Sequence, residues 1–198
     1  DIDDQDVSGG RLAMEWRPNH RLTAIARFNY QRLAVGGYDH HDLDGPPYTQ
    51  SRALDESSWG KRSIVSLDID YVLGAATLHS TSSWASYDGV NRTDLMDYME
   101  IATGLVNPLT AVNHQYTDDF IQEVRLESQH TARIDWLAGV YYQHRDNTFT
   151  QDFPAPGFDA QTGGAAAAFG YPDNLYVLDL DQPVDELAAY GEIGWRPS

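Results

Sequence analysis

The stretch Asp4–Glu15, "DQDVSGGRLAME", places oxygen-bearing side chains at the spacing of a calcium-binding EF-hand loop. The residues at the ligand positions are Asp4, Asp6, Ser8, Gly9 and Glu15. An EF-hand loop must be followed by a helix, but Pro18 would end that helix and Glu15 falls in a pattern of strand alternation. We therefore predict a strand here, and no calcium site.

Two other stretches contain residues with possible chemistry. "YDHHDLDG", residues 38–45, contains two histidines and three aspartates, which could bind a metal or an iron chelate. No ligand spacing elsewhere completes such a site, so a solvated acidic loop is the favoured interpretation. "GGAAAAFG", Gly163–Gly170, lacks the Lys-Ser/Thr of a phosphate-binding loop and is expected to be flexible or briefly helical.

The sequence accordingly predicts no catalytic residues, no cofactor-binding residues and no metal ligands, and the protein is not expected to be an enzyme. No Ser/His/Asp order stands out among the many polar loop residues. The chain has no cysteine, which rules out disulfides, thiol catalysis and cysteine-ligated zinc.

Charge and hydropathy exclude two further classes of protein. The formal net charge of −17 argues against nucleic acid as a partner, because binding phosphates requires clustered Lys and Arg. No segment approaches the roughly 18 consecutive apolar residues of a membrane helix. The mean hydropathy of −0.50 still permits a membrane β-barrel, whose strands need only about 9–11 alternating residues.

Alternation of apolar and polar residues recurs along the whole chain and predicts an all-β, antiparallel, up-and-down meander of about seven strands. Two of these strands lie within 118–147, where Val124 and Leu126 alternate with Glu123 and Arg125. The other expected strands are 11–17, 21–33, 63–73, 75–87 and 187–195.

The connections between these strands alternate strictly between short and long. "RPNH", "LG" and "SQHTA" have the length of hairpin turns, whereas the other connections are expected to span about 25 to 40 residues. One end of the sheet should therefore carry tight turns and the other large loops. Trp16, Trp136 and Trp195 are expected near the turn end, as in an interfacial aromatic girdle.

These patterns leave two architectures open. A soluble antiparallel sandwich would also have amphipathic strands, but it rarely keeps all its long loops at one end. Strands of about 9–13 residues and a charged second face favour a membrane barrel. In a barrel the apolar face would contact lipid, and Glu123, Arg125, Glu127 and Asp135 would face the lumen, where opposite charges can pair across strands.

The most specific phrase is Gln122-Glu123-Val124-Arg125-Leu126, with Ser128, followed after a turn by Trp136-Leu137-Ala138-Gly139-Val140-Tyr141-Tyr142. This phrase resembles a recurring hairpin of TonB-dependent outer-membrane receptors. Residues 74–88 and 186–198 are similar to other strands of that family, and 11–31 to an ordinary hairpin of the same barrel. The resemblance covers the strands and leaves the loops unmatched.

The resemblance implies that residues 1–198 form part of a transmembrane β-barrel wall with long extracellular loops and short periplasmic turns. Such receptors have about 22 strands and a plug domain, so we expect this chain to be an internal segment of the barrel. The implied function is TonB-energised uptake of a scarce ligand across the cell outer membrane of a Gram-negative bacterium. The ligand could be an iron chelate (siderophore uptake), cobalamin, an oligosaccharide or a similar small molecule.

The implied partners are outer-membrane lipid and lipopolysaccharide, a small-molecule ligand, and the TonB complex through the plug region. The alternative is a soluble or cell-surface β-sandwich binding module, for example one that binds carbohydrate. Under the barrel interpretation, acidic loop residues would give the outer face a negative potential that attracts divalent cations or a cationic substrate. These residues are Asp39, Asp42, Asp44, Asp55, Glu56, Asp94, Asp97 and Glu100.

Overall fold

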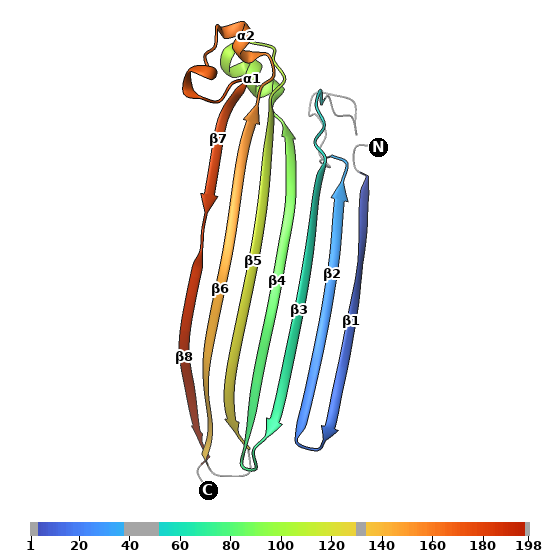
Figure 1. The fold of residues 1–198 in the computed structure, drawn as a ribbon, viewed down its shortest axis with the longest axis vertical. Coiled ribbons are helices and arrows are strands. Elements are labelled where there is room, and N and C mark those ends of the chain that lie inside the picture. The colour runs from blue at the N-terminus through green and yellow to red at the C-terminus, as the bar shows by residue number, and fades with distance from the viewer. Residues whose placement is uncertain (1–3, 38–51, 130–133, 197–198) are drawn as a thin grey trace.

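The computed structural model describes residues 4–37, 52–129 and 134–196, which form one eight-stranded antiparallel sheet (Figure 1). Each strand from β1 to β7 pairs with the next one along the chain, and β8 also pairs with β6. The strands are β1 Gln5–Asn19, β2 Leu22–Val35, β3 Ser58–Val72, β4 Ala76–Asp94, β5 Thr110–Ser128, β6 Ile134–Pro154, β7 Asn174–Asp181 and β8 Val184–Trp195. The predicted all-β antiparallel meander is thus confirmed.

The strands are longer than the alternation alone indicates. β4 and β5 each have 19 residues and β6 has 21, so the sheet continues well beyond the apolar positions. The connections are correspondingly shorter than predicted: 36–57, 95–109 and 155–173 each fall below the expected 25 to 40 residues. The reason is that polar residues occur on both faces at the outer ends of the strands, with few apolar residues such as Phe149 among them, which hides the period-2 pattern in the sequence.

The strand count also differs from the prediction, because β7 and β8 lie end to end along the same edge of β6 (Figure 1). Between them, the amide of Gln182 still donates to the carbonyl of Asn147 at 2.8 Å. Pro183 follows, and it has no N–H to donate to a ladder. One position in the meander is therefore filled by two short strands.

Tight turns and large loops lie at opposite ends of the sheet, as predicted (Figure 1). In the β1–β2 turn, the Asn19 side-chain oxygen accepts hydrogen bonds from the amides of Arg21 (2.8 Å) and Leu22 (3.2 Å). Gly74, with a φ of 89°, supplies the left-handed residue of the β3–β4 turn. We call this the turn end, and the opposite one the loop end; residues 130–133 of the third turn lie outside the described part.

A small core at the loop end joins two of the large loops. Met99 of α1 (Met96–Thr103) packs with Leu109 and Ala155, and all three are almost fully buried. Phe158 of α2 (Phe158–Thr162) covers this cluster from the β6–β7 loop. Figure 1 shows α1 and α2 side by side above β4–β7. The two loops therefore pack together as one cap over the loop end of the sheet.

Among the helices in the described ranges, none has the length and hydropathy needed to span a membrane.

Candidate functional site

One face of the sheet presents apolar side chains, many of them exposed. Strand pairing places Trp16, Phe28, Val65, Trp84 and Val140 on this face, together with their in-register neighbours. The most exposed members are Leu187 at 81%, Ile193 at 79%, Trp195 at 72% and Leu12 at 69%. All five tryptophans of the chain project from this side. We call it the apolar face.

The apolar face has a sharp limit toward the loop end. On β2 it runs from Leu22 to Tyr30, and Arg32 follows at the next position on the same side. On neighbouring strands this side continues with charged groups, including the Lys61–Asp88 pair at 2.8 Å and the His144–Asp185 contact at 2.8 Å. Most of the apolar residues thus form a band about nine residues long, bordered by charge, and Trp59 and Val90 lie beyond the charged row.

Polar groups within the apolar band bond to one another. Gln122 accepts a hydrogen bond from Ser82 at 2.5 Å and donates to Ser80 at 3.2 Å. Because each donor is already paired with an acceptor, placing these groups in an apolar environment has only a small free-energy penalty.

The opposite face, which we call the polar face, carries paired charges across the strands. Near its middle Asp119, only 8% exposed, accepts from Arg145 at 2.7 Å and from Gln143 at 2.8 Å. Toward the turn end Arg27 pairs with Asp68, and Thr81 donates to Asp68 at 2.9 Å. Such pairing fixes the strand register, since a one-residue slip would invert the faces.

The four charged residues predicted to share one side do so. Glu123, Arg125, Glu127 and Asp135 all lie on the polar face by register. Glu123 accepts a hydrogen bond from Tyr190, and Arg196 pairs with Asp135. Tyr190 also lies over Gly139, where a Cβ would overlap its ring.

A pocket of about 330 Å³ opens on the polar face near the loop end, and we call it the loop-end pocket. It follows one row of paired residues across five strands: Leu33, Gly60, Gly89, Gln115 and Phe149. The two glycines have no side chains, so a neighbouring ring can approach the backbone closely there. The ring of Tyr87 lies across both glycines, within 3.5 Å of the position of an added Cβ on Gly60.

Side-chain amides line the rim of the loop-end pocket, and each is held by a hydrogen bond to a neighbouring residue. Asn91 donates to Ser58 at 3.1 Å, Gln151 donates to Asn113 at 2.6 Å, and Gln115 donates to Asn147 at 3.3 Å. Asn113 and Gln115 retain further donor or acceptor capacity. The pocket therefore combines an apolar and aromatic floor with a fixed polar rim.

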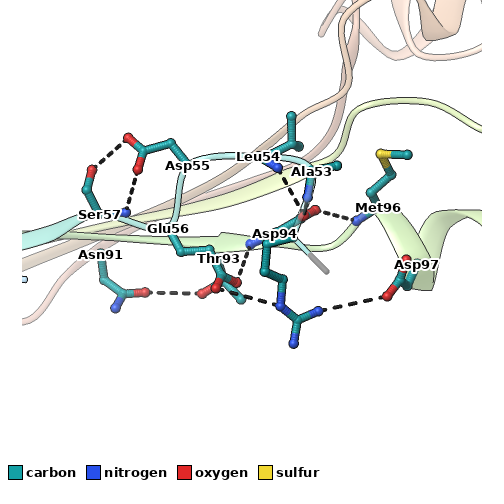
Figure 2. A network of polar contacts seen from close by, with 11 residues as sticks. Ala53, Leu54, Asp55, Glu56, Ser57, Asn91, Thr93, Asp94, Met96 and Asp97 are labelled. Atoms are coloured by element: carbon teal, nitrogen blue, oxygen red, sulfur yellow. Dashed lines mark hydrogen bonds and ion pairs between the residues drawn. The ribbon is translucent and has the colours of Figure 1, made fainter. Parts of the chain in front are cut away.

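The β2–β3 loop is anchored beside this pocket by two buried carboxylates (Figure 2). Asp94 accepts from the amides of Ala53 (2.9 Å), Leu54 (3.2 Å) and Met96 (2.9 Å). Glu56 in turn accepts from the Asp94 amide at 3.0 Å. Two of the acidic residues expected to project a negative potential are thus buried in loop structure, whereas the Asp97 side chain is 75% exposed.

Asp159 organises the β6–β7 loop in a similar way. Its carboxylate accepts from the amides of Ala166 (2.7 Å), Ala167 (3.1 Å) and Asp173 (2.7 Å). Hydrogen bonds from the Asp173 amide, then from those of Ala167 and Ala166, lower the pKa of Asp159 below its ordinary value of 3.8, and desolvation only partly opposes them.

This loop is therefore expected to loosen in acid. Because the folded pKa of Asp159 lies below the unfolded value, the carboxylate stabilises the loop fully above that unfolded value. The contribution is lost as the pH falls through the folded pKa, below 3.8. Amide-exchange protection of residues 158–173, corrected for intrinsic rates, should decrease there, and Asp159→Asn should remove this pH dependence. Asp97→Asn in α1 is the matched control, and an unchanged pH dependence in Asp159→Asn would contradict the assignment.

The chemical motifs considered in the sequence do not assemble into a site. Residues 5–15 of the EF-hand-like stretch lie in β1, where Asp6 and Glu15 point to opposite faces and cannot share an ion. The His/Asp stretch 38–45 lies outside the described residues. Gly163–Gly170 contains a short 3-10 helix, η1 (Ala167–Phe169), in agreement with a briefly helical segment. Across the described ranges, no group of three or more His, Asp or Glu could hold a metal ion.

The residues of the loop-end pocket were not predicted from the sequence. Gly60 and Gly89 are 29 positions apart along the chain, and only the β3–β4 register brings them together. Both glycines lie just outside the strands expected at 63–73 and 75–87, so the sequence carried no strand-glycine signal for close packing there.

No model of a known protein family matches this chain, and no characterised protein sequence matches it.

Proposed function

We propose that this chain is part of the wall of an outer-membrane transport barrel of the TonB-dependent receptor type. The main support for this proposal is the exposed apolar band, bordered by charged residues, on one face of the sheet. The other face is polar, and its charged side chains pair with one another. Lipid-facing barrel surfaces have an apolar band about 25 Å tall and interfacial aromatics, whereas their lumens are polar. Strands of 14 to 21 residues at six positions also exceed the usual strand length of about 5–6.

Under this proposal the apolar face contacts lipid acyl chains, and the charged row above it lies at the level of lipopolysaccharide headgroups. The polar face lines the lumen, the loop end is extracellular and the turn end periplasmic. Energy for uptake of a small-molecule ligand would reach the barrel from the TonB complex through a plug region. The protein would transport its ligand without covalent chemistry.

Spin labels along β5 distinguish the barrel from the β-sandwich alternative. The chain has no cysteine, so single cysteines can be placed at 120–127 and labelled with nitroxide in the protein as the cell makes it. In bilayers, even positions such as Val124 should be accessible to oxygen, and odd positions such as Arg125 to a water-soluble nickel complex. In a sandwich the even positions would be inaccessible to both reagents, because they would lie in a dry core; that pattern would reject the proposal.

A further inference from the structure

We infer that the loop-end pocket binds a neutral saccharide, or the end of a longer saccharide chain, on its way through the lumen. This inference rests on the proposed function and specifies the substrate class. It depends on the shape of the pocket, on the chemistry of its rim and on its charge.

The shape of the pocket suits a flat ring. The row Leu33–Gly60–Gly89–Gln115–Phe149 has no side chains at its two glycines and is bounded by larger side chains on both sides. The Tyr87 ring rests on the glycines and forms part of the floor. Aromatic and aliphatic surfaces of this kind pack against the C–H faces of sugar rings, and the pocket volume of about 330 Å³ is at the small end for ligand sites.

The rim of the pocket suits hydroxyl groups. Each amide carries two donors and an acceptor oxygen, so Asn113 and Gln115 can both donate to and accept from a polyhydroxylated ligand. Their positions are fixed by Gln151 and Asn147, respectively. Because these rotamers are already held, binding requires little additional ordering of side chains.

The charge of the pocket argues against ionic ligands. No carboxylate is among its lining residues in the described part of the chain, so a cationic ligand finds no partner there. Of its two basic residues, Lys61 projects from the apolar face and pairs with Asp88 at 2.8 Å. Arg62 lies 5.9 Å from the centre of the Tyr87 ring. A single guanidinium beside an aromatic ring provides too little positive charge to bind a multiply charged anionic iron chelate.

Binding measurements on the protein as the cell makes it, in detergent micelles, test this inference. The probes are maltohexaose, cellohexaose and xylohexaose as neutral saccharides, and ferric citrate as an anionic chelate. We expect at least one saccharide to bind, and Asn113→Leu and Gln115→Leu each to weaken it about tenfold, as expected for losing a hydrogen bond in a fixed site. Ser83→Ala, on the polar face but outside the pocket, is the matched control and should bind as wild type.

Three results would overturn the inference: no saccharide binds, saccharide binding is unchanged in both pocket variants, or ferric citrate binds and depends on Asn113 and Gln115. In each case the spin-label pattern of β5 is measured on the single-cysteine variants at 120–127, with no pocket substitution, in the same micelles. If that pattern alternates between oxygen and nickel accessibility, any of these results rejects the saccharide but not the barrel. If the pattern does not alternate, the barrel itself is rejected.

Discussion

Replacing Val124 by arginine is expected to lower the free energy of unfolding in phospholipid bilayers by about 2–4 kcal/mol. Val124 lies in the apolar band of β5, opposite Ser80 on β4 and Val140 on β6. Under the proposed function this position contacts acyl chains, where a guanidinium loses its hydration. Equilibrium unfolding in urea, followed by tryptophan fluorescence in bilayer vesicles, measures the change.

The matched control is Ile121→Arg, which introduces the same side chain three residues earlier on the same strand. Ile121 lies on the polar face, in register with Ser83 and Gln143. Under the same proposal the polar face lines a water-filled lumen, so this variant should lose much less stability than Val124→Arg. An equal or larger loss at Ile121 would show that the polar face is not water-lined.

Removing the Asp94 carboxylate is expected to release the β2–β3 loop from the end of β4. In Asp94→Ala the amides of Ala53, Leu54 and Met96 lose their acceptor at a site that is only 9% exposed. Leaving buried donors unsatisfied costs roughly 1–3 kcal/mol. Amide hydrogen exchange should show that residues 53–57 and 95–99 open more readily by about that free energy, while the centres of β4 and β5 keep their protection.

Asp55→Ala provides the control within the same loop. Among the described residues, Asp55 accepts from Ser57, through its amide at 3.1 Å and its hydroxyl at 2.8 Å, in an exposed setting. Its removal should therefore alter exchange only locally and by less. If Asp55→Ala opened the loop as readily as Asp94→Ala, burial of the Asp94 carboxylate would not be what anchors the segment.

The prediction from sequence succeeded where a single periodicity governed both faces of a strand. Val124 and Leu126 against Glu123 and Arg125 gave the strand, its faces and its antiparallel partner. It failed at the strand ends, because Asn113, Gln115 and Thr117 alternate along β5 with residues that are also polar, such as His114 and Asp118. Hydrogen bonds between strands extend the sheet there, and these depend on partners far away in the chain.

The two loop anchors could not have been read from the sequence either. Asp159 and Asp94 look like ordinary acidic loop residues, and their burial depends on backbone amides that reach them only after folding. The core formed by Met99, Leu109 and Ala155 likewise joins residues from separate loops. From the sequence alone such long connections look like flexible loops, because neighbouring residues do not indicate which distant residues they pack against.

The sequence by itself determined an antiparallel meander with one apolar face, one charged face and all its large loops at one end. These properties follow from alternation and turn residues, which act over a few neighbouring positions. Only the tertiary structure decided the length of the sheet, the break between β7 and β8, and the loop-end pocket. All three depend on pairing between strands. In the pocket, this pairing brings Gly60 and Gly89 beneath Tyr87 and sets Leu33 and Phe149 on either side of them.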